Sequence, residues 1–192
     1  MRAIAPVPLL CTALLLASPA AGQPAPPDAA RSHDPHPAAD SVPLYDDLGD
    51  LHHEITTSSP RAQAYFDQGL RLQYAFNHAE AIRSYREALR HDPSCAMCWW
   101  GIALALGPNI NAPMSAEAAA GAREAVEEAV ALAEAASDAE RAFIQALAVR
   151  YTDDPEAPRP PLDSAYARAM AEVTAEHPGD PDALTLRAAA LM

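Results

Sequence analysis

The fold is decided by residues 62–99, which read AQAYFDQGLRLQYAFNHAEAIRSYREALRHDPSCAMCW. Aromatic, small and proline residues recur in this stretch at the spacing of two antiparallel helices in a repeat of 34 residues. The residues that fit this spacing are Tyr65, Gly69, Leu72, Ala81, Tyr85, Ala88 and Pro93. Trp99 stands 34 positions after Tyr65, where the next unit requires an aromatic residue of its own. We therefore expect an all-α protein of stacked antiparallel helix pairs.

Local signals place the helices of the first unit. Serine before proline, at Ser59 and Pro60, predicts a capped helix start, and apolar residues carry this helix to about Phe76. A second helix is expected over about 79–90, where apolar residues recur at helical spacing. It ends before Pro93, because a proline disfavours the helical conformation of the residue that precedes it.

The later units are less regular. We expect a third helix over about 96–106, followed by an insertion at 107–114, since Ala122 matches the repeat seven residues late. Asp138 is expected to cap the next helix, whose partner runs over about 163–176. The predicted units are residues 62–95, 96–136 and 138–180, with a partial unit at 181–192.

The part of the chain before these helices divides into three segments. Residues 1–22 have a positive start, a short apolar run and small residues at a cleavage site, which predicts an export signal. Residues 23–45 are rich in proline and are expected to form a disordered linker. Residues 46–57 are expected to lead into the helices with one short helix, so the helical repeat domain spans 46–192. An export signal places the mature protein outside the cytoplasm, and we expect the periplasm.

Composition and charge exclude several classes of partner. Half of the residues are hydrophobic and only 6% are aromatic, which favours close packing of helices around small side chains. The chain has 13 basic residues, all arginine, against 26 acidic ones, for a net charge of −13. A nucleic acid or an anionic membrane surface requires a basic footprint, so neither is an expected partner. The apolar run of the export signal is too short to span a membrane, and no other stretch of the mature chain is expected to do so.

Several stretches resemble tetratricopeptide repeat (TPR) proteins, and among them a group of exported bacterial proteins. These stretches are AQAYFDQGL (62–70), YAFNH (74–78), CAMCWWG (95–101) and LGPNINAPM (106–114), with a weaker likeness at 139–147 and 189–192. The resemblance implies a right-handed α-solenoid in the bacterial cell envelope, in a group with no assigned biochemical role. Chains of that group continue into further repeats, and the last helix here reaches Met192 without a cap, so we expect a C-terminally truncated array.

The same resemblance implies a groove for a peptide, because TPR arrays bind peptides along the concave face formed by the first helix of each unit. The corresponding residues are Gln63, Phe66, Leu70, Gln73, Tyr74, Met97, Trp100 and Leu104. Aromatic rings at such positions cover apolar side chains, and amides bond to the main chain of the ligand. We expect Phe66, Tyr74, Met97 and Trp100 to be the anchors. The alternative is that Phe66 and Leu70 only pack against the next helix or the N-terminal lead-in.

We therefore expect a non-catalytic scaffold that binds a protein or a peptide, and no enzyme. The chain carries no recognisable pair of nucleophile and base, no paired catalytic carboxylates and no glycine-rich phosphate loop. No cofactor is expected.

Cys95 and Cys98 form the sharpest chemical motif, at the start of the expected third helix. Residues three apart on a helical turn lie close, so export favours a structural disulfide between them. A redox-active pair is a second interpretation, since a helix N-terminus lowers the pKa of a thiol, and two reduced packing residues are a third. A thiol-redox or metal-handling protein built on this pair is the alternative to the scaffold. Haem attachment is excluded, because Trp99 stands where a histidine is required.

Histidines suggest a metal site only weakly. His52 and His53 are adjacent in the lead-in, and His78 and His91 stand in expected turns. A zinc or copper site requires three or four converging ligands, whereas adjacent histidines of a helix point to different sides. We expect these histidines to be solvated and no metal to be bound. The acidic residues Glu117, Glu124, Glu127, Glu128 and Glu134 are expected to form a solvated helix face.

Overall fold

Residues 42–111, 113–154 and 157–192 are described by a computed structural model of the chain, and they belong to one compact unit. This described part contains seven α-helices and one short 3₁₀ turn, and it contains no β-strand, which confirms the all-α class. The elements are α1 (Pro60–Tyr74), α2 (His78–His91), α3 (Ala96–Leu106), α4 (Ala116–Leu132), η1 (Ala133–Ala135), α5 (Asp138–Ala148), α6 (Arg159–Glu176) and α7 (Pro181–Ala190).

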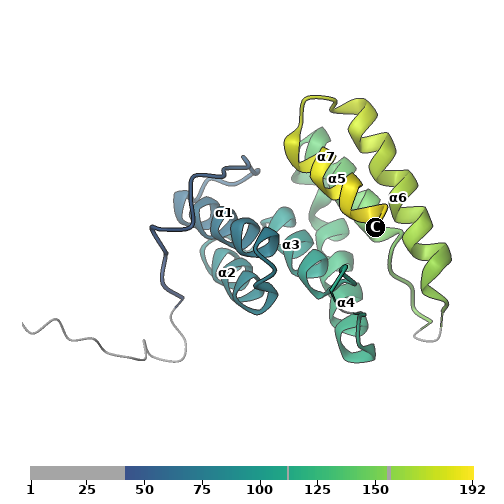
Figure 1. Ribbon diagram of the computed structural model, residues 1–192. Coiled ribbons are helices and arrows are strands. Elements are labelled where there is room, and N and C mark those ends of the chain that lie inside the picture. Colours follow the sequence, from purple (N-terminus) through teal and green to yellow (C-terminus); the bar gives the residue numbers. More distant parts are fainter. Residues whose placement is uncertain (1–41, 112, 155–156) are drawn as a thin grey trace, which may run out of the picture. The chain divides into compact units, whose positions relative to one another are not determined.

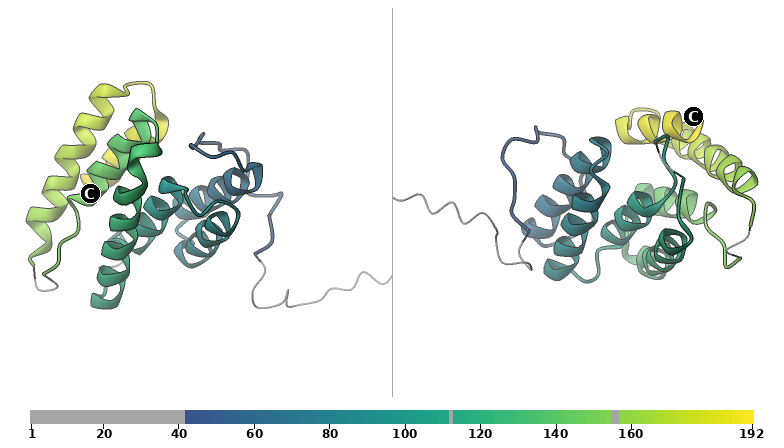
Figure 2. Two further views of the ribbon diagram at one scale, coloured as in Figure 1. Left: turned by 180° about the vertical axis from the view of Figure 1, so that it is seen from behind. Right: turned by 60° about the horizontal axis from the view of Figure 1, so that its bottom comes forward.

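The helices pack in the order of the chain. α1 pairs with α2, α3 with α4 and α5 with α6, while α7 lies against α6 (Figure 1, Figure 2). Between pairs, α2 contacts α3 and α4 contacts α5. One hydrophobic core runs through all of these contacts, from Val42 to Leu186. In the described residues, no helix is long and apolar enough to cross a membrane.

The first helix begins where its sequence predicts and ends earlier. The hydroxyl of Ser59 accepts a hydrogen bond from the amide of Ala62, and Pro60 occupies the first turn. At the other end, Phe76 has a φ of 60°, and the amide of Asn77 bonds to the carbonyl of Leu72 at 2.9 Å. This is the Schellman arrangement that terminates helices, with a phenylalanine where glycine is usual. Phe76 is therefore outside the helix and 56% exposed, which corrects the expected helix end.

A tyrosine held between two glycines joins the first three helices. Tyr85 of α2 is fully buried, and its ring passes between Gly69 of α1 and Gly101 of α3. A Cβ atom would lie 2.5 Å from Cε1 of Tyr85 if added at Gly69, and 2.6 Å if added at Gly101. No real Cβ makes so short a contact, so both positions require glycine for the helices to approach the ring.

Two predicted helix starts are corrected, while the third helix spans 96–106 as predicted. Ser137 caps α5, not Asp138: its hydroxyl accepts from the amide of Glu140, whose carboxylate accepts from the amide of Ser137. This reciprocal capping box satisfies two free amides at once. The helix expected over 163–176 begins at Arg159, because prolines fit the first helical turn, where an amide has no partner.

The lead-in also differs from its prediction. Residues 46–57 contain no helix. Residues 42–45, expected to end a disordered linker, are packed on α1: the hydroxyl of Tyr65 donates to the carbonyl of Val42 at 2.8 Å. The amide of Tyr45 donates to Oε1 of Gln68 at the same distance. The predicted export signal and most of the predicted linker lie outside the described residues.

Candidate functional site

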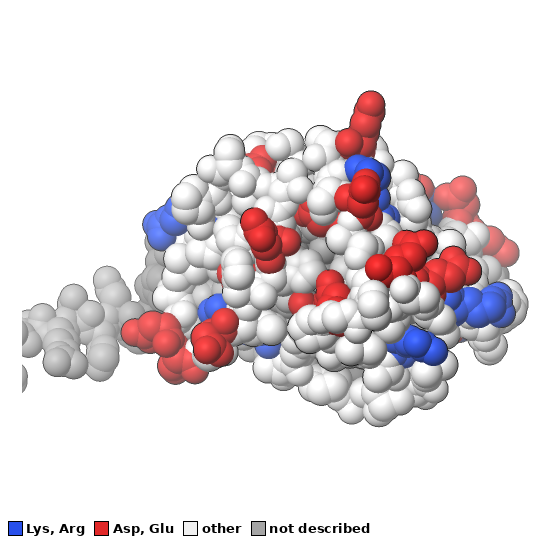
Figure 3. Space-filling model, turned by 90° about the horizontal axis from the view of Figure 1, so that it is seen from above, with Lys and Arg blue, Asp and Glu red and all other residues white. Residues whose placement is uncertain are grey.

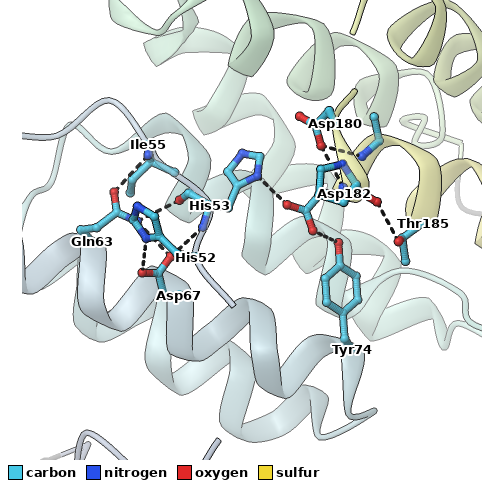
Figure 4. A network of polar contacts seen from close by, with 11 residues as sticks. His52, His53, Ile55, Gln63, Asp67, Tyr74, Asp180, Asp182 and Thr185 are labelled. Carbon is cyan, nitrogen blue, oxygen red and sulfur yellow. Dashed lines mark hydrogen bonds and ion pairs between the residues drawn. The ribbon is translucent and has the colours of Figure 1, made fainter. Parts of the chain in front are cut away.

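An irregular N-terminal segment (residues 42–57) is bound by the side chains of α1. The carboxamide of Gln63 makes two hydrogen bonds with its main chain: Nε2 donates to the carbonyl of His53 at 2.8 Å, and Oε1 accepts from the amide of Ile55 at 3.0 Å (Figure 4). One carboxamide thus pairs with the segment as the peptide group of a neighbouring strand would. The segment obtains main-chain hydrogen bonds without forming a sheet.

Three further side chains of α1 continue this pairing. Asp67 accepts from the amide of His53 at 3.1 Å, and Arg71 donates to the carbonyl of Leu51 at 2.8 Å. Gln68 donates to the carbonyl of Pro43 at 2.9 Å, in addition to its bond with Tyr45. Gln63, Asp67 and Arg71 are four residues apart, so they form one polar row along the helix.

The end of the segment is bound by other helices. The amide of Thr56 donates to Oε1 of Glu140 in α5 at 2.6 Å, and its hydroxyl donates to Oε2 of the same carboxylate. The hydroxyl of Thr57 donates to Asp92, which follows α2, at 2.5 Å. Glu140 is only 4% exposed, so its carboxylate depends on these donors and on the capping box for its hydrogen bonds.

The side chain of His53 links the N-terminal segment to α7, the last helix of the described residues. Its Nδ1 lies 2.7 Å from Oδ2 of Asp182 in α7, and the hydroxyl of Tyr74 donates to Oδ1 of that carboxylate at 2.7 Å (Figure 4). The imidazole ring lies between aromatic rings, with centroid distances of 6.0 Å to Phe66 and 5.8 Å to Phe143. His53 is therefore a packed, hydrogen-bonded side chain, which corrects the expectation of a solvated histidine.

Burial and the neighbouring charges shift the pKa values of His53 and Asp182 in opposite directions. Burial would lower the pKa of His53, but the hydrogen bond and the charge of Asp182 outweigh it, so this pKa lies above its usual value. Burial would raise the pKa of Asp182, but hydrogen bonds from His53 and Tyr74 outweigh it, and the pKa falls below the usual range. Burial, and next the hydrogen bond to Asp182, raise the pKa of Tyr74. Both shifts of the His53–Asp182 pair favour the charged forms.

The predicted groove residues fall into two classes. The five apolar ones are core side chains that are at most 6% exposed: Phe66, Leu70, Met97, Trp100 and Leu104. They do not line an open hollow, so the alternative interpretation of Phe66 and Leu70 as packing residues describes the structure better. The polar ones behave differently, since Gln63 binds the N-terminal segment and Tyr74 binds Asp182. Gln73 is half-buried, and its Oε1 is a buried atom without a hydrogen bond within the described residues.

The sequence interpretation missed the residues that bind the segment. Asp67, Gln68 and Glu140 are polar residues at buried positions, with exposures of 7%, 1% and 4%. The polar row of α1 could have been found from the sequence, because Gln63, Asp67 and Arg71 recur at helical spacing beside the apolar face of this helix. Nothing in the sequence near Glu140 or Asp182 indicates that they contact residues 84 and 129 positions away.

A polar recess lies beside the segment. It has a volume of about 690 Å³ and is lined by residues 54–58, by the turn before α3, by the end of α4 with η1, and by the start of α5. Hydroxyl groups of Thr56, Thr57, Ser58, Ser94 and Ser137 belong to its lining residues. The bound segment thus has one side against helices and another side on an open recess.

The other predicted candidates do not join this site. Cys95 and Cys98 form a disulfide, and both residues are 0% exposed. His91 stacks on Tyr65 with a centroid distance of 5.5 Å, and His78 lies near Asn109. Among the described residues, the one cluster with a possible metal-ligand geometry is instead His53 with Asp180 and Asp182, whose ligand atoms lie within 4.8 Å of one another.

Comparison of the chain with protein-family models, with curated proteins and with solved structures gave no match.

Proposed function

We propose that this chain is a non-catalytic scaffold that binds extended segments of proteins or peptides. The proposal includes a TPR-like right-handed α-solenoid and export to the periplasm, which rest on the repeat spacing and the N-terminal pattern of the sequence. The observation that carries it is the pairing of α1 side chains with the main chain of residues 51–55.

This pairing suits a receptor for an extended chain of variable sequence. Gln63, Asp67 and Arg71 make four hydrogen bonds to main-chain groups of the N-terminal segment. Every peptide presents the same amides and carbonyls, so such contacts give affinity that depends little on side chains. Specificity then comes from side-chain contacts, of which the bond between His52 and Asp67 is one.

The N-terminal segment competes with any external ligand for Gln63, Asp67 and Arg71. A tethered segment has an effective concentration of the order of millimolar, so an external peptide must exchange with it. Acidic side chains predominate on the face shown in Figure 3, and the net charge is −13, so among peptides that make the same contacts a neutral or basic one is favoured.

The test is binding of a fluorescent peptide with the sequence of residues 49–59 to the whole chain, measured by anisotropy in the presence of EDTA. Ile55 is 5% exposed and Leu51 packs on the core, so Leu51→Ala/Ile55→Ala should loosen the segment, and circular dichroism checks that the helices are retained. We expect this double variant to bind the peptide about tenfold more tightly than the wild type does, because competition by the segment is weaker.

Two controls examine the mode of binding. A peptide that is N-methylated at the amide of Ile55 lacks the donor to Gln63 and should bind less tightly. Adding Gln63→Ala to the double variant should weaken binding of the unmodified peptide. Absence of binding to the double variant, with its helical circular dichroism intact, would overturn the proposal.

The rival function, a thiol-redox or metal-handling protein that uses Cys95 and Cys98, receives no support from these contacts. Both sulfur atoms are bonded to each other, and neither residue is exposed to a reaction partner. A reactive cysteine requires access as well as a lowered pKa.

A further inference from the structure

Side chains from two distant parts of the sequence meet at the start of α7. His53 comes from the N-terminal segment, Asp180 caps α7, and Asp182 lies in its first turn (Figure 4). One potential ligand atom from each of the three residues lies within 4.8 Å of the other two. An imidazole and two carboxylates are donors that zinc and related divalent ions accept in proteins.

The cluster contains two carboxylates and one imidazole, so His53 can balance only one of the two negative charges. Asp182 is 5% exposed, and Asp180 is half-buried beside it. Among the described residues no arginine forms an ion pair with either carboxylate, and His53 forms one with Asp182. Two neighbouring carboxylates with limited access to water thus have one cationic partner, and a divalent cation would stabilise both charges.

The hydrogen bonds around the cluster are of the kind that orient the carboxylate ligands of a metal site. Tyr74 bonds to Oδ1 of Asp182 and leaves Oδ2 toward His53. Oδ1 of Asp180 accepts hydrogen bonds from the amides of Asp182 and Ala183 at 2.8 and 3.0 Å. The other carboxylate oxygen of Asp180, Oδ2, takes no part in these two bonds. Ligating carboxylates in proteins are commonly fixed in this way by hydrogen bonds of their other oxygen.

One buried hydroxyl of the core, that of Tyr85, has no partner within the described residues. Tyr85 is 0% exposed, and its hydroxyl has no hydrogen bond within the described residues. Its ring comes from α2 and passes between Gly69 and Gly101. Burial raises the pKa of Tyr85, and the negative charge of Asp182 raises it further. A buried hydroxyl of this kind ordinarily has a partner, such as a water molecule.

We propose that His53, Asp180 and Asp182 bind one divalent transition-metal ion, with zinc the best fit, and that water completes its coordination. Bond lengths of about 2.1 Å in a tetrahedral site separate ligand atoms by about 3.4 Å. The 2.7 Å between His53 and Asp182 therefore has to widen by less than an ångström. The metal takes the place of the proton in this hydrogen bond, and the proton is released to solvent.

Such a site would fix the N-terminal segment to α7, and its existence does not depend on peptide binding. The metal replaces one hydrogen bond between His53 and Asp182 with two coordinate bonds. We therefore expect zinc to raise the melting temperature of the whole chain, since a ligand that binds only the folded state stabilises it.

The test is titration of the whole chain, without a histidine tag, with Zn²⁺ against a chromogenic chelator. His33 and His36 are replaced with glutamine in all samples, so that they cannot contribute. We expect one zinc ion per chain, and affinities about tenfold or more lower in His53→Gln and in Asp180→Asn. Asparagine retains the oxygen that caps α7, so Asp180→Asn tests the ligand in an intact fold.

The matched control is His52→Gln, because His52 is adjacent in sequence, pairs with Asp67 and lies outside the cluster. Its zinc affinity should stay within about twofold of the starting protein, well below the change expected for a lost ligand. Equal zinc affinity in Asp180→Asn and the starting protein would overturn the proposal, as would failure of the starting protein to bind zinc at all.

Discussion

The amide of Thr56 donates a 2.6 Å hydrogen bond to Oε1 of Glu140, 84 positions further along the chain. The same carboxylate closes the capping box of α5 with Ser137. One buried side chain therefore completes the start of a helix and binds the end of the N-terminal segment.

Glu140→Gln should lower the free energy of unfolding by about 3 kcal/mol. The substitution replaces one acceptor oxygen with an NH2 group, which cannot accept the hydrogen bonds that reach this position. Urea denaturation measures this change. Glu134→Gln is the control, since Glu134 is exposed, and it should leave the unfolding midpoint unchanged. A loss for Glu140→Gln no larger than that of the control would contradict the role of this carboxylate.

Trp100 should matter for stability more than for binding. The sequence suggested a binding anchor, but Trp100 is 3% exposed and packs edge-on against Phe143 with a centroid distance of 5.8 Å. Trp100→Ala should reduce the free energy of unfolding by about 3–5 kcal/mol, whereas Trp99→Ala removes a half-buried ring and should have a smaller effect. Thermal and urea denaturation of both variants measure the difference, and the opposite ranking would place Trp100 outside the core.

Gly69→Ala should be destabilising by about 1–3 kcal/mol, since its methyl group would overlap the ring of Tyr85. Gly179→Ala is the matched control, because nothing lies within 4 Å of a Cβ added there. Differential scanning calorimetry should show a lower melting temperature for the first variant only. Equal melting temperatures for the two variants would disprove the close approach of α1 to Tyr85.

Stability should fall in acid partly through Asp163. Burial would raise the pKa of Asp163, but hydrogen bonds from Arg159 and Arg150 outweigh it and hold the pKa below the usual 3.8. A lowered pKa in the folded state adds stability above the usual pKa, which is lost as the pH falls through the lowered value. Asp163→Asn should therefore be less stable than the wild type near about pH 7, and the difference should vanish by about pH 2.

Urea denaturation of both proteins across this range measures the effect. The carboxylate is 35% exposed, so solvent screening makes it small. A difference that is constant with pH would assign it to packing of the side chain and not to its charge.

Local signals predicted the helices well because they act within a few residues. The cap at Ser59, the range of α3 and the positions of Gly69 and Tyr85 follow from neighbours in sequence and from the 34-residue spacing. The end of α1 was misplaced, since a phenylalanine at position 76 adopts a conformation that glycine usually takes.

The candidate site was predicted only in part. Gln63 and Tyr74 were expected to contact a ligand, and they bind the N-terminal segment and Asp182 instead. The segment has no helical periodicity, and its contacts with Glu140 and Asp182 join residues far apart in sequence. Such contacts depend on the placement of whole helices, which local patterns do not contain.

In a chain of stacked helix pairs, each unit ordinarily touches only its neighbours, so folding can begin anywhere and the two ends can fray separately. The contact of His53 with Asp182 spans 129 positions and links the two ends of the described helices. Residues 53–57 can dock only after α5 and α7 are in place, and docking closes a long loop at an entropic cost. Unfolding should therefore be more cooperative than unit-by-unit melting, with the N-terminal segment and α7 gaining or losing order together.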